Sequence, residues 1–512
     1  MVERRWGSNG NPYLSGIWQL VVAGLVLPLV CGLVFFWPDR TIPYVDDLFF
    51  IPWASEFAQT GHHVNPLLAV QFPGLENYHL QPRLHLILAG WFLAVTGVSI
   101  ATIVLFEFLC YVATSLVFVV FCLRSNLRTA AFFTPLVFAP MYVVSGFRLE
   151  LTGALIWMLG LLLLLPIAAK AVTGEARQTG SETAASIAGT ALMGIAPLTG
   201  LSMLAWSVGV IAVLQIWRLR TRQASIARVL SEGLVAFAIA ATLFAVSVNF
   251  EFAEFFRQIA YHATRSHGSG RFNVEAIFRA AMFAGVAWFV FRKSRTLGLI
   301  CFCLAVGQFL GAVVHDRPLI RNLAAAMLFL MAVDTLLDTR WQRVKLGLCV
   351  ALVLVLSANF IVFYVVSQPL PNRPAVVEAY RQDLADGKRV FIDETMAHHF
   401  LDQQTSGALS WTWGGTFPKG RPTSMADLKE GDVWYVSEYT LLGYLKGRHD
   451  VAQKVWPQNE YHHVLQFSCS LGRHSCNLPA KRWTMMRLER REGTVMATEL
   501  GAGTAPRPIA EK

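Results

Sequence analysis

Charged residues are scarce in this sequence, and the short motifs of common soluble enzymes are absent from it. Asp, Glu, Lys and Arg together make up 15% of the 512 residues, whereas 54% are hydrophobic. Soluble domains are typically about 25% charged, so the composition indicates a polytopic membrane protein. The sequence has no P-loop, no Gly-rich dinucleotide loop, no Cys-x-x-Cys and no His-Glu-x-x-His. These absences argue against the familiar nucleotide-binding and zinc enzymes.

A net charge of +10 would suggest nucleic-acid binding in a soluble protein. Here the basic residues occur in short clusters between apolar runs, which is the pattern of cytoplasmic loops in membrane proteins, so no nucleic-acid partner is expected. Arg4 and Arg5 precede the first apolar run, Ile17 to Trp37, which is long enough to span a bilayer and has no cleavage site after it. The N-terminus is therefore predicted to be cytoplasmic. The other ends assigned to the cytoplasm are also basic, at Lys170, Arg177, Arg218, Arg220, Arg222, Arg228, Arg292, Lys293, Arg295, Arg340, Arg343 and Lys345.

We predict about 11 spans, which would place the C-terminus outside. The apolar run from Arg83 to Gly97 is too short, because a span needs roughly 20 residues. It is expected to lie in the interface, with His85 and Trp91 at its polar boundary. All 13 histidines fall on predicted outer segments or on this helix, which suggests that the polar chemistry is outside. The spans after the first are 100–123, 130–146, 151–169, 184–198, 201–217, 229–250, 274–291, 297–314, 318–337 and 346–366.

The composition changes after Ser367, where several prolines form a stiff linker. Strands are predicted at Arg389–Ile392, Asp432–Val436 and Lys481–Leu488, with helix-like pieces between them. The predicted organisation has three parts. These are a transmembrane domain over 1–366 with its first outer loop at 38–99, an extracytoplasmic α/β or α+β domain over 367–492, and a disordered tail over 493–512.

The eight cysteines fall into two groups. Cys469 and Cys476 lie in the outer domain, where thiols can oxidise, and they could close a short disulfide loop or remain free. The other six are expected to be small core residues of the spans.

The stretch from Pro43 to Leu84 carries the strongest functional signal. Asp46 and Asp47 follow the first span by a few residues, and a helix is predicted from Leu48 to Thr60, ended by Gly61. The acid pair could simply cap that helix. It also stands where a lipid headgroup meets water, and a carboxylate there could act as general base on an acceptor hydroxyl.

This layout resembles the GT-C superfamily, whose members are membrane glycosyltransferases that use polyprenyl-phosphate-linked sugars. They include protein O-mannosyltransferases and lipid A aminoarabinose transferases. The family often has His-Pro-Pro-Leu where this chain has His79-Leu80-Gln81-Pro82-Arg83-Leu84, so the motif is loosened here. The matching residues are Asp46, Asp47, Gly61, His79, Pro82 and Leu84.

The resemblance implies roles for several of these side chains. Asp46 would be the acceptor-activating base and Asp47 the second acid, while His79 would belong to the substrate site. Arg148 and Glu150 lie at an outer turn like the Arg-x-Glu turns of some relatives. They could equally form a local ion pair worth about 0–1 kcal/mol.

A further outer cluster contains His315, Asp316, Arg317 and Arg321, just before a span. An arginine at a helix N-terminus, together with the free N–H groups there, suits a phosphate. Arg317 or Arg321 is therefore predicted to bind the lipid phosphate, and His315 to belong to the substrate site. The alternative is that these side chains extend to the membrane surface without binding substrate.

No cofactor is expected. A divalent metal beside Asp46, Asp47, His62 and His63 is the alternative, although adjacent histidines on a helix diverge and no known metal motif accompanies them.

The predicted function is an inverting hexosyl- or pentosyl-type transfer from a polyprenyl-phosphate donor to a hydroxyl of a glycan, lipid or protein. The site would face the periplasm of a bacterial inner membrane. The alternative is a transporter or flippase of lipid-linked sugars, but such proteins favour ionisable residues near the bilayer midplane and broken helices in paired halves. A non-catalytic membrane scaffold is the third hypothesis.

Overall fold

The computed structural model divides the chain into two compact units. One contains Met1–Phe36, Phe108–Val143 and Leu149–Ala358, and the other contains Trp37–Glu107, Val144–Arg148 and Asn359–Lys512. The structure describes residues 18–36, 47–65, 82–174, 179–265, 274–314, 318–366, 373–393, 396, 399–401, 403, 409–410, 428–437, 485–500 and 505–509.

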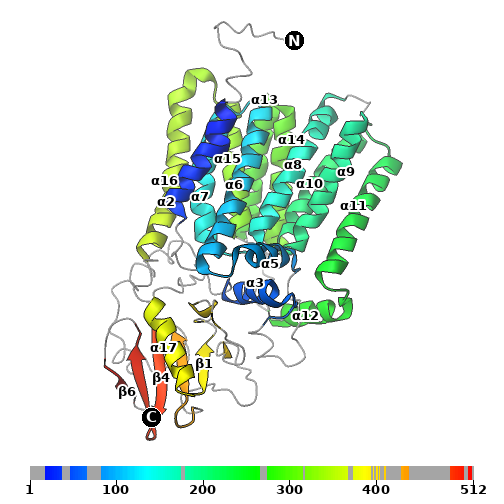
Figure 1. Cartoon of the computed structure of the whole chain (residues 1–512). Helices are drawn as coiled ribbons and strands as arrows, with labels where there is room; N and C mark the ends of the chain where they lie inside the picture. Colours follow the sequence, from blue (N-terminus) through cyan, green and yellow to red (C-terminus); the bar gives the residue numbers. More distant parts are fainter. Residues whose placement is uncertain are drawn as a thin grey trace. The chain divides into compact units, whose positions relative to one another are not determined.

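The first unit is a bundle of long, mostly apolar helices (Figure 1). Within a bilayer only an unbroken helix satisfies the backbone hydrogen bonds of an isolated segment, and every predicted span overlaps a helix here. The helices are η1 (Val22–Val26), α2 (Leu27–Phe35), α6 (Ile100–Arg124), α7 (Arg128–Ser145), α8 (Glu150–Thr173), α9 (Gly180–Ile195), η2 (Ala196–Leu198), α10 (Met203–Arg220), α11 (Ile226–Ser247), α12 (Phe252–Arg265), α13 (Val274–Lys293), α14 (Arg295–Val314), α15 (Pro318–Leu336), η3 (Thr339–Trp341) and α16 (Gln342–Val366).

Seven helices among the described residues are long and apolar enough to cross a membrane. They establish a multi-pass helical membrane protein, as the composition predicts. The predicted spans at α7, α9, α13 and α14 are helical but do not meet the same requirement. The total of about 11 spans therefore stays a prediction.

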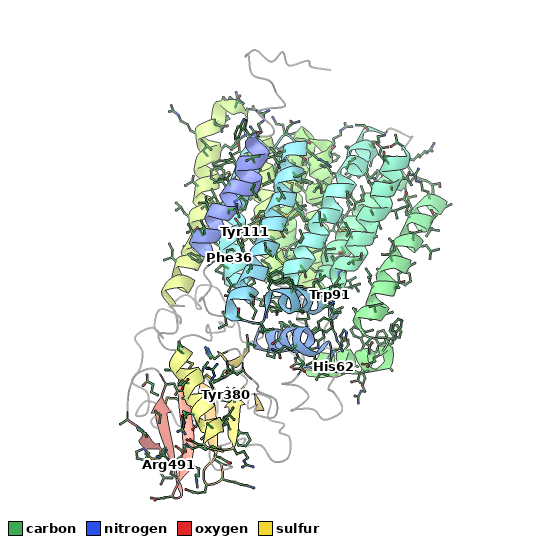
Figure 2. The ribbon with its side chains drawn as sticks, in the orientation of Figure 1. Phe36, His62, Trp91, Tyr111, Tyr380 and Arg491 are labelled. Carbon is green, nitrogen blue, oxygen red and sulfur yellow. The ribbon has the colours of Figure 1, made fainter. Side chains whose placement is uncertain are left out.

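Aromatic rings and glycines set the packing within the bundle. At the end of α2 the ring of Phe36 stacks on Tyr111 of α6, with centroids 5.4 Å apart (Figure 2). Helices α10 and α14 approach closely at Gly209 and Gly307, where a Cβ built on Gly209 would lie 2.6 Å from the Gly307 amide nitrogen. The indole of Trp206 fills the space over Gly307. Small residues thus permit backbone contact, as in other membrane helix pairs.

The described part of the second unit has three helices besides the first residues of α6, and a six-stranded sheet. The helices are α3 (Asp47–Thr60), α5 (Leu84–Thr96) and α17 (Arg373–Ala385). The sheet has the order β2-β1-β3-β4-β5-β6, with β1 parallel to β2 and β3 and the remaining pairs antiparallel. Its strands are β1 (Val390–Asp393), β2 (Leu409–Ser410), β3 (Val433–Ser437), β4 (Met485–Arg491), β5 (Thr494–Glu499) and β6 (Arg507–Ile509).

Alternation along the strands gives this sheet two apolar faces. Val376 and Tyr380 of α17 pack against Ile392 and Tyr435 on one face, and Tyr380 is labelled in Figure 2. The opposite face buries Trp434 with Phe391, Leu488 and other side chains. The three strands predicted from the sequence therefore belong to one mixed sheet with a helix on one face.

The expected disordered tail over 493–512 is wrong in part. Residues 494–499 form β5, which pairs along its length with β4, and 507–509 form β6 on the outer side of β5. The Gly, Ala and Pro content suggested disorder, but an existing strand edge can order a short segment that has little strand propensity of its own.

Candidate functional site

The first outer loop places the start of helix α3 at the predicted acid pair. Asp47 is the first residue of α3, which ends at Thr60 and is followed by Gly61 with φ of +73°. A left-handed residue is the usual end of a helix, and glycine adopts it without strain. Asp46, His79 and the side chain of Asp47 lie outside the described residues, so their predicted roles stay predictions.

Helices α3 and α5 are joined by a cluster of aromatic rings. The Trp53 ring stacks on Phe57 at 5.5 Å with an interplanar angle of 10°, and His63 meets both rings edge-on. The guanidinium carbon of Arg83 lies 5.6 Å from the centre of the Trp53 ring. Gly90 of α5 contacts Phe57, leaving no room there for a Cβ. This joint fixes how the two loop helices cross.

His85 connects α5 to two other segments of the second unit, which includes the first residues of α6 up to Glu107 and the turn at Val144–Arg148. Its ring lies 5.7 Å from Phe106 of α6 and 4.9 Å from Phe147 in the turn after α7. The side chain of His85 is fully buried, whereas Trp91 is 59% exposed (Figure 2). Their place at the polar boundary of the membrane stays a prediction. His85 therefore brings the first loop next to the turn that carries Arg148.

The turn between α7 and α8 carries two predicted site residues. Arg148 is half-buried, and its amide donates to the Gly146 carbonyl at 3.0 Å. Glu150 is buried at the first turn of α8 and accepts a hydrogen bond from the Ser202 hydroxyl at 3.1 Å. A carboxylate at a helix N-terminus is stabilised by the helix dipole. Glu150 thus has a structural role in the bundle, whatever else it does.

The outer cluster before α15 is described only at Arg321. Its side chain is half-buried in the first turns of α15, and Nε donates to Asn322 Oδ1 at 3.4 Å. His315 and Arg317 lie outside the described residues. Arg321 and Glu150 belong to the first unit. Of the described site residues outside the first loop, only Arg148 shares the second unit with that loop.

Sequence reasoning assigned no role to two buried charged residues, Arg83 and Glu107. Arg83 is fully buried, and Glu107 in α6 is 2% exposed. Arg83 flanks an apolar run, which is the usual place of a boundary charge, whereas Glu107 interrupts one, where a charge is costly. The burial of Arg83 follows from the packing of α3 against α5, which the sequence does not show. The sequence offered one signal for it, since an arginine near aromatic residues can stack on a ring.

Neither the metal alternative nor the disulfide is tested by the described residues. The described side chains, which do not include those of Asp46 and Asp47, contain no group of three or more His, Cys, Asp and Glu residues that could hold a metal ion. Cys469 and Cys476 also lie outside the description. The six described cysteines are buried free thiols, as the sequence predicts.

Comparison with solved structures identifies the fold. The chain is similar to ArnT from Cupriavidus metallidurans bound to undecaprenyl phosphate, with 16% identity, a TM-score of 0.52, and coverage of 85% of this chain and 95% of that one. No protein-family model and no curated protein matches the sequence. The S. cerevisiae protein O-mannosyltransferase Pmt1-Pmt2 complex bound to the sugar donor is also similar, with 14% identity and a TM-score of 0.35. That match covers 49% of this chain and 35% of the yeast one, so the chain spans about a third of its length.

Proposed function

We propose that this chain, which has the GT-C fold, is a glycosyltransferase that uses a polyprenyl-phosphate-linked sugar. The observation that carries the proposal is the likeness to ArnT over 95% of that protein's length, in a structure that holds undecaprenyl phosphate. A second support is the position of the acid pair in the sequence, since Asp46 precedes and Asp47 begins a loop helix, α3, that packs against α5.

The proposed reaction is a single inverting displacement. Asp46, or Asp47, takes the proton from the acceptor hydroxyl while the acceptor oxygen bonds to the anomeric carbon of the sugar. The bond from that carbon to the phosphate oxygen breaks, and the phosphate leaves with its electron pair. Arginine side chains would stabilise the charge that develops on it, with Arg148, Arg317 and Arg321 as the candidates.

The acceptor and its location are proposals of the same kind. The acceptor hydroxyl would belong to an envelope glycan, a lipid or a protein on the outer face of a bacterial inner membrane. The sheet of the second unit would help to select it, and the apolar helices would receive the prenyl chain. This reaction needs no nucleotide at the site.

The proposal is tested by Asp46→Asn and Asp47→Asn in the full-length protein. We expect at least one of them to lower turnover by about 100-fold or more, since a general base contributes on that scale. The assay measures product formed in detergent from synthetic undecaprenyl-phosphate sugars and envelope extracts.

Asp338→Asn is the matched control, because Asp338 is half-exposed and pairs only loosely with Arg340 at 3.7 Å. It should keep full turnover. Normal turnover in both acid variants would end the mechanism. Donor binding with no product in detergent would favour a carrier, because a flippase makes no glycoside.

A further inference from the structure

Arg83 occupies an unfavourable position for a charged side chain. It is the N-cap residue of α5 and is 0% exposed. The helix dipole disfavours a cation at that end, and burying a charge is costly unless other groups compensate. The contact with the Trp53 ring at 5.6 Å is one such compensation, because a cation over an indole face gains electrostatic energy when water is excluded.

Trp53 is held through its ring rather than through its N–H group. The side chain is fully buried, and its Nε1 has no hydrogen-bond partner among the residues that the structure describes. Among the described residues, its ring contacts Phe57, which stacks on it, His63 at an edge, and Arg83. Of these three, Arg83 alone belongs to α5, so it links the orientation of α3 to α5.

This link has a mechanical consequence for the acid pair. Trp53 follows Asp47 by six residues on the same helix, which corresponds to about 9 Å along the axis. Gly90 against Phe57 and Ala54 provides a second contact point between the two helices. Two separate contacts fix both the crossing and the rotation of α3, and in the sequence the acid pair stands at the start of this helix.

We propose that Arg83 is a positioning residue, which acts through the face of Trp53 to set the rotation of α3 and thereby the direction of the acid pair. The inference rests on the proposed function, in which that pair activates the acceptor.

The test compares Arg83→Met and Arg83→Lys in the full-length protein. Methionine keeps the length of the side chain and removes the charge, whereas lysine keeps a cation over the ring. We expect Arg83→Met to lower kcat by about 10- to 100-fold with the donor KM changed less than twofold, because a small misplacement of a catalytic group has that effect. Arg83→Lys should recover most of kcat.

A double-variant comparison isolates the route through the ring. If Arg83 acts through Trp53, Arg83→Met in a Trp53→Leu background should lower kcat by less than about twofold further. Arg340→Met, at a side chain that is 77% exposed, is the control for loss of an arginine and should be neutral.

Each other outcome overturns the inference. A raised donor KM with unchanged kcat in Arg83→Met would make Arg83 a substrate ligand. Additive losses in the double variant would exclude the route through Trp53, and loss of the folded protein in both Arg83 variants would make the role structural. Failure of the proposed function looks different, since wild-type protein would then form no product or Asp46→Asn and Asp47→Asn would both be fully active.

Discussion

At the scale of single residues, the burial of charged side chains differs most from what their positions in the sequence suggest. Arg218 reads as one of several basic residues at a cytoplasmic end, yet it is 0% exposed and donates to Glu232 at 2.7 Å. Ser186 donates to the same carboxylate, so α9, α10 and α11 share one buried ion pair. Removing one partner of such a pair is costly because the other charge stays buried. The positive-inside pattern groups Arg218 with the other basic residues at predicted cytoplasmic ends, but it does not show which of them are buried in the protein.

The sheet unit has a second charged network, centred on two carboxylates. Asp383 of α17 accepts hydrogen bonds from Arg487 at 2.6 Å and from the Tyr435 hydroxyl at 2.6 Å. Glu489 pairs with Arg487 at 2.8 Å and with Lys388 at 3.1 Å. Burial alone would raise both pKa values, but the hydrogen bonds from these cations outweigh it. The pKa of Asp383 is lowered, and that of Glu489 falls to about 2.

This network predicts acid sensitivity of the sheet unit. A carboxyl group whose pKa is lower in the folded than in the unfolded state stabilises the fold above the unfolded value. That stabilisation is lost as the pH falls through the folded value. For Glu489 the pH window runs from 4.5 down to about 2, and the stabilisation lost is on the order of 3 kcal/mol.

The measurement is hydrogen exchange of β3 and β4 in the full-length protein at a series of pH values. Glu489→Gln should flatten the dependence over this window. An unchanged slope in that variant would assign the sensitivity to other carboxylates.

At the scale of elements, helices are predicted well wherever an apolar run is long. Each run becomes a helix because it must satisfy its own backbone hydrogen bonds. The same reasoning does not find α12, because this short helix has no continuous apolar run: its apolar residues Phe252, Phe255, Phe256 and Ile259 recur at helical spacing on one face. It fails also for β2 and β6, whose two and three residues are strands only because a neighbour supplies the hydrogen bonds.

The contact between α10 and α14 gives a prediction at this scale. Gly209→Ala places a Cβ against the backbone of Gly307, so we expect a loss of about 1–3 kcal/mol in stability from overpacking. Thermal unfolding in detergent measures it. Gly233→Ala in α11 is the matched control, since a Cβ there meets nothing within 4 Å, and it should be neutral or slightly stabilising. Equal melting temperatures for the two variants would contradict the close approach.

At the scale of the whole molecule, the fold class followed from composition and from the resemblance of the first loop. The candidate site followed only in part. The sequence indicated the acid pair, the following helix and the Arg148 turn, but not the burial of Arg83 and His85, which depends on how distant segments pack. The periodic pattern of one segment predicts its secondary structure but does not show which distant segment packs against it.

The orientation of the chain in the membrane is the corresponding prediction. In a Cys469→Ser and Cys476→Ser background, His62→Cys should react with a membrane-impermeant maleimide added to intact spheroplasts, since His62 is exposed in the first loop. Arg340→Cys should react only after the membrane is opened, because positive charge favours the cytoplasmic side. The opposite pattern would place the acid pair in the cytosol and remove the proposed reaction.

Strand β6 has a practical consequence for handling the protein. It covers the outer side of β5 at Val495–Ala497 with three residues close to the C-terminus. Truncating the chain before residue 505, or displacing β6 with a fusion partner attached directly after residue 512, would expose the amides and carbonyls of β5 that pair with β6. An uncovered strand edge recruits strands from other molecules. Aggregates that grow from this edge would be easily mistaken for poor detergent solubility of the helical bundle.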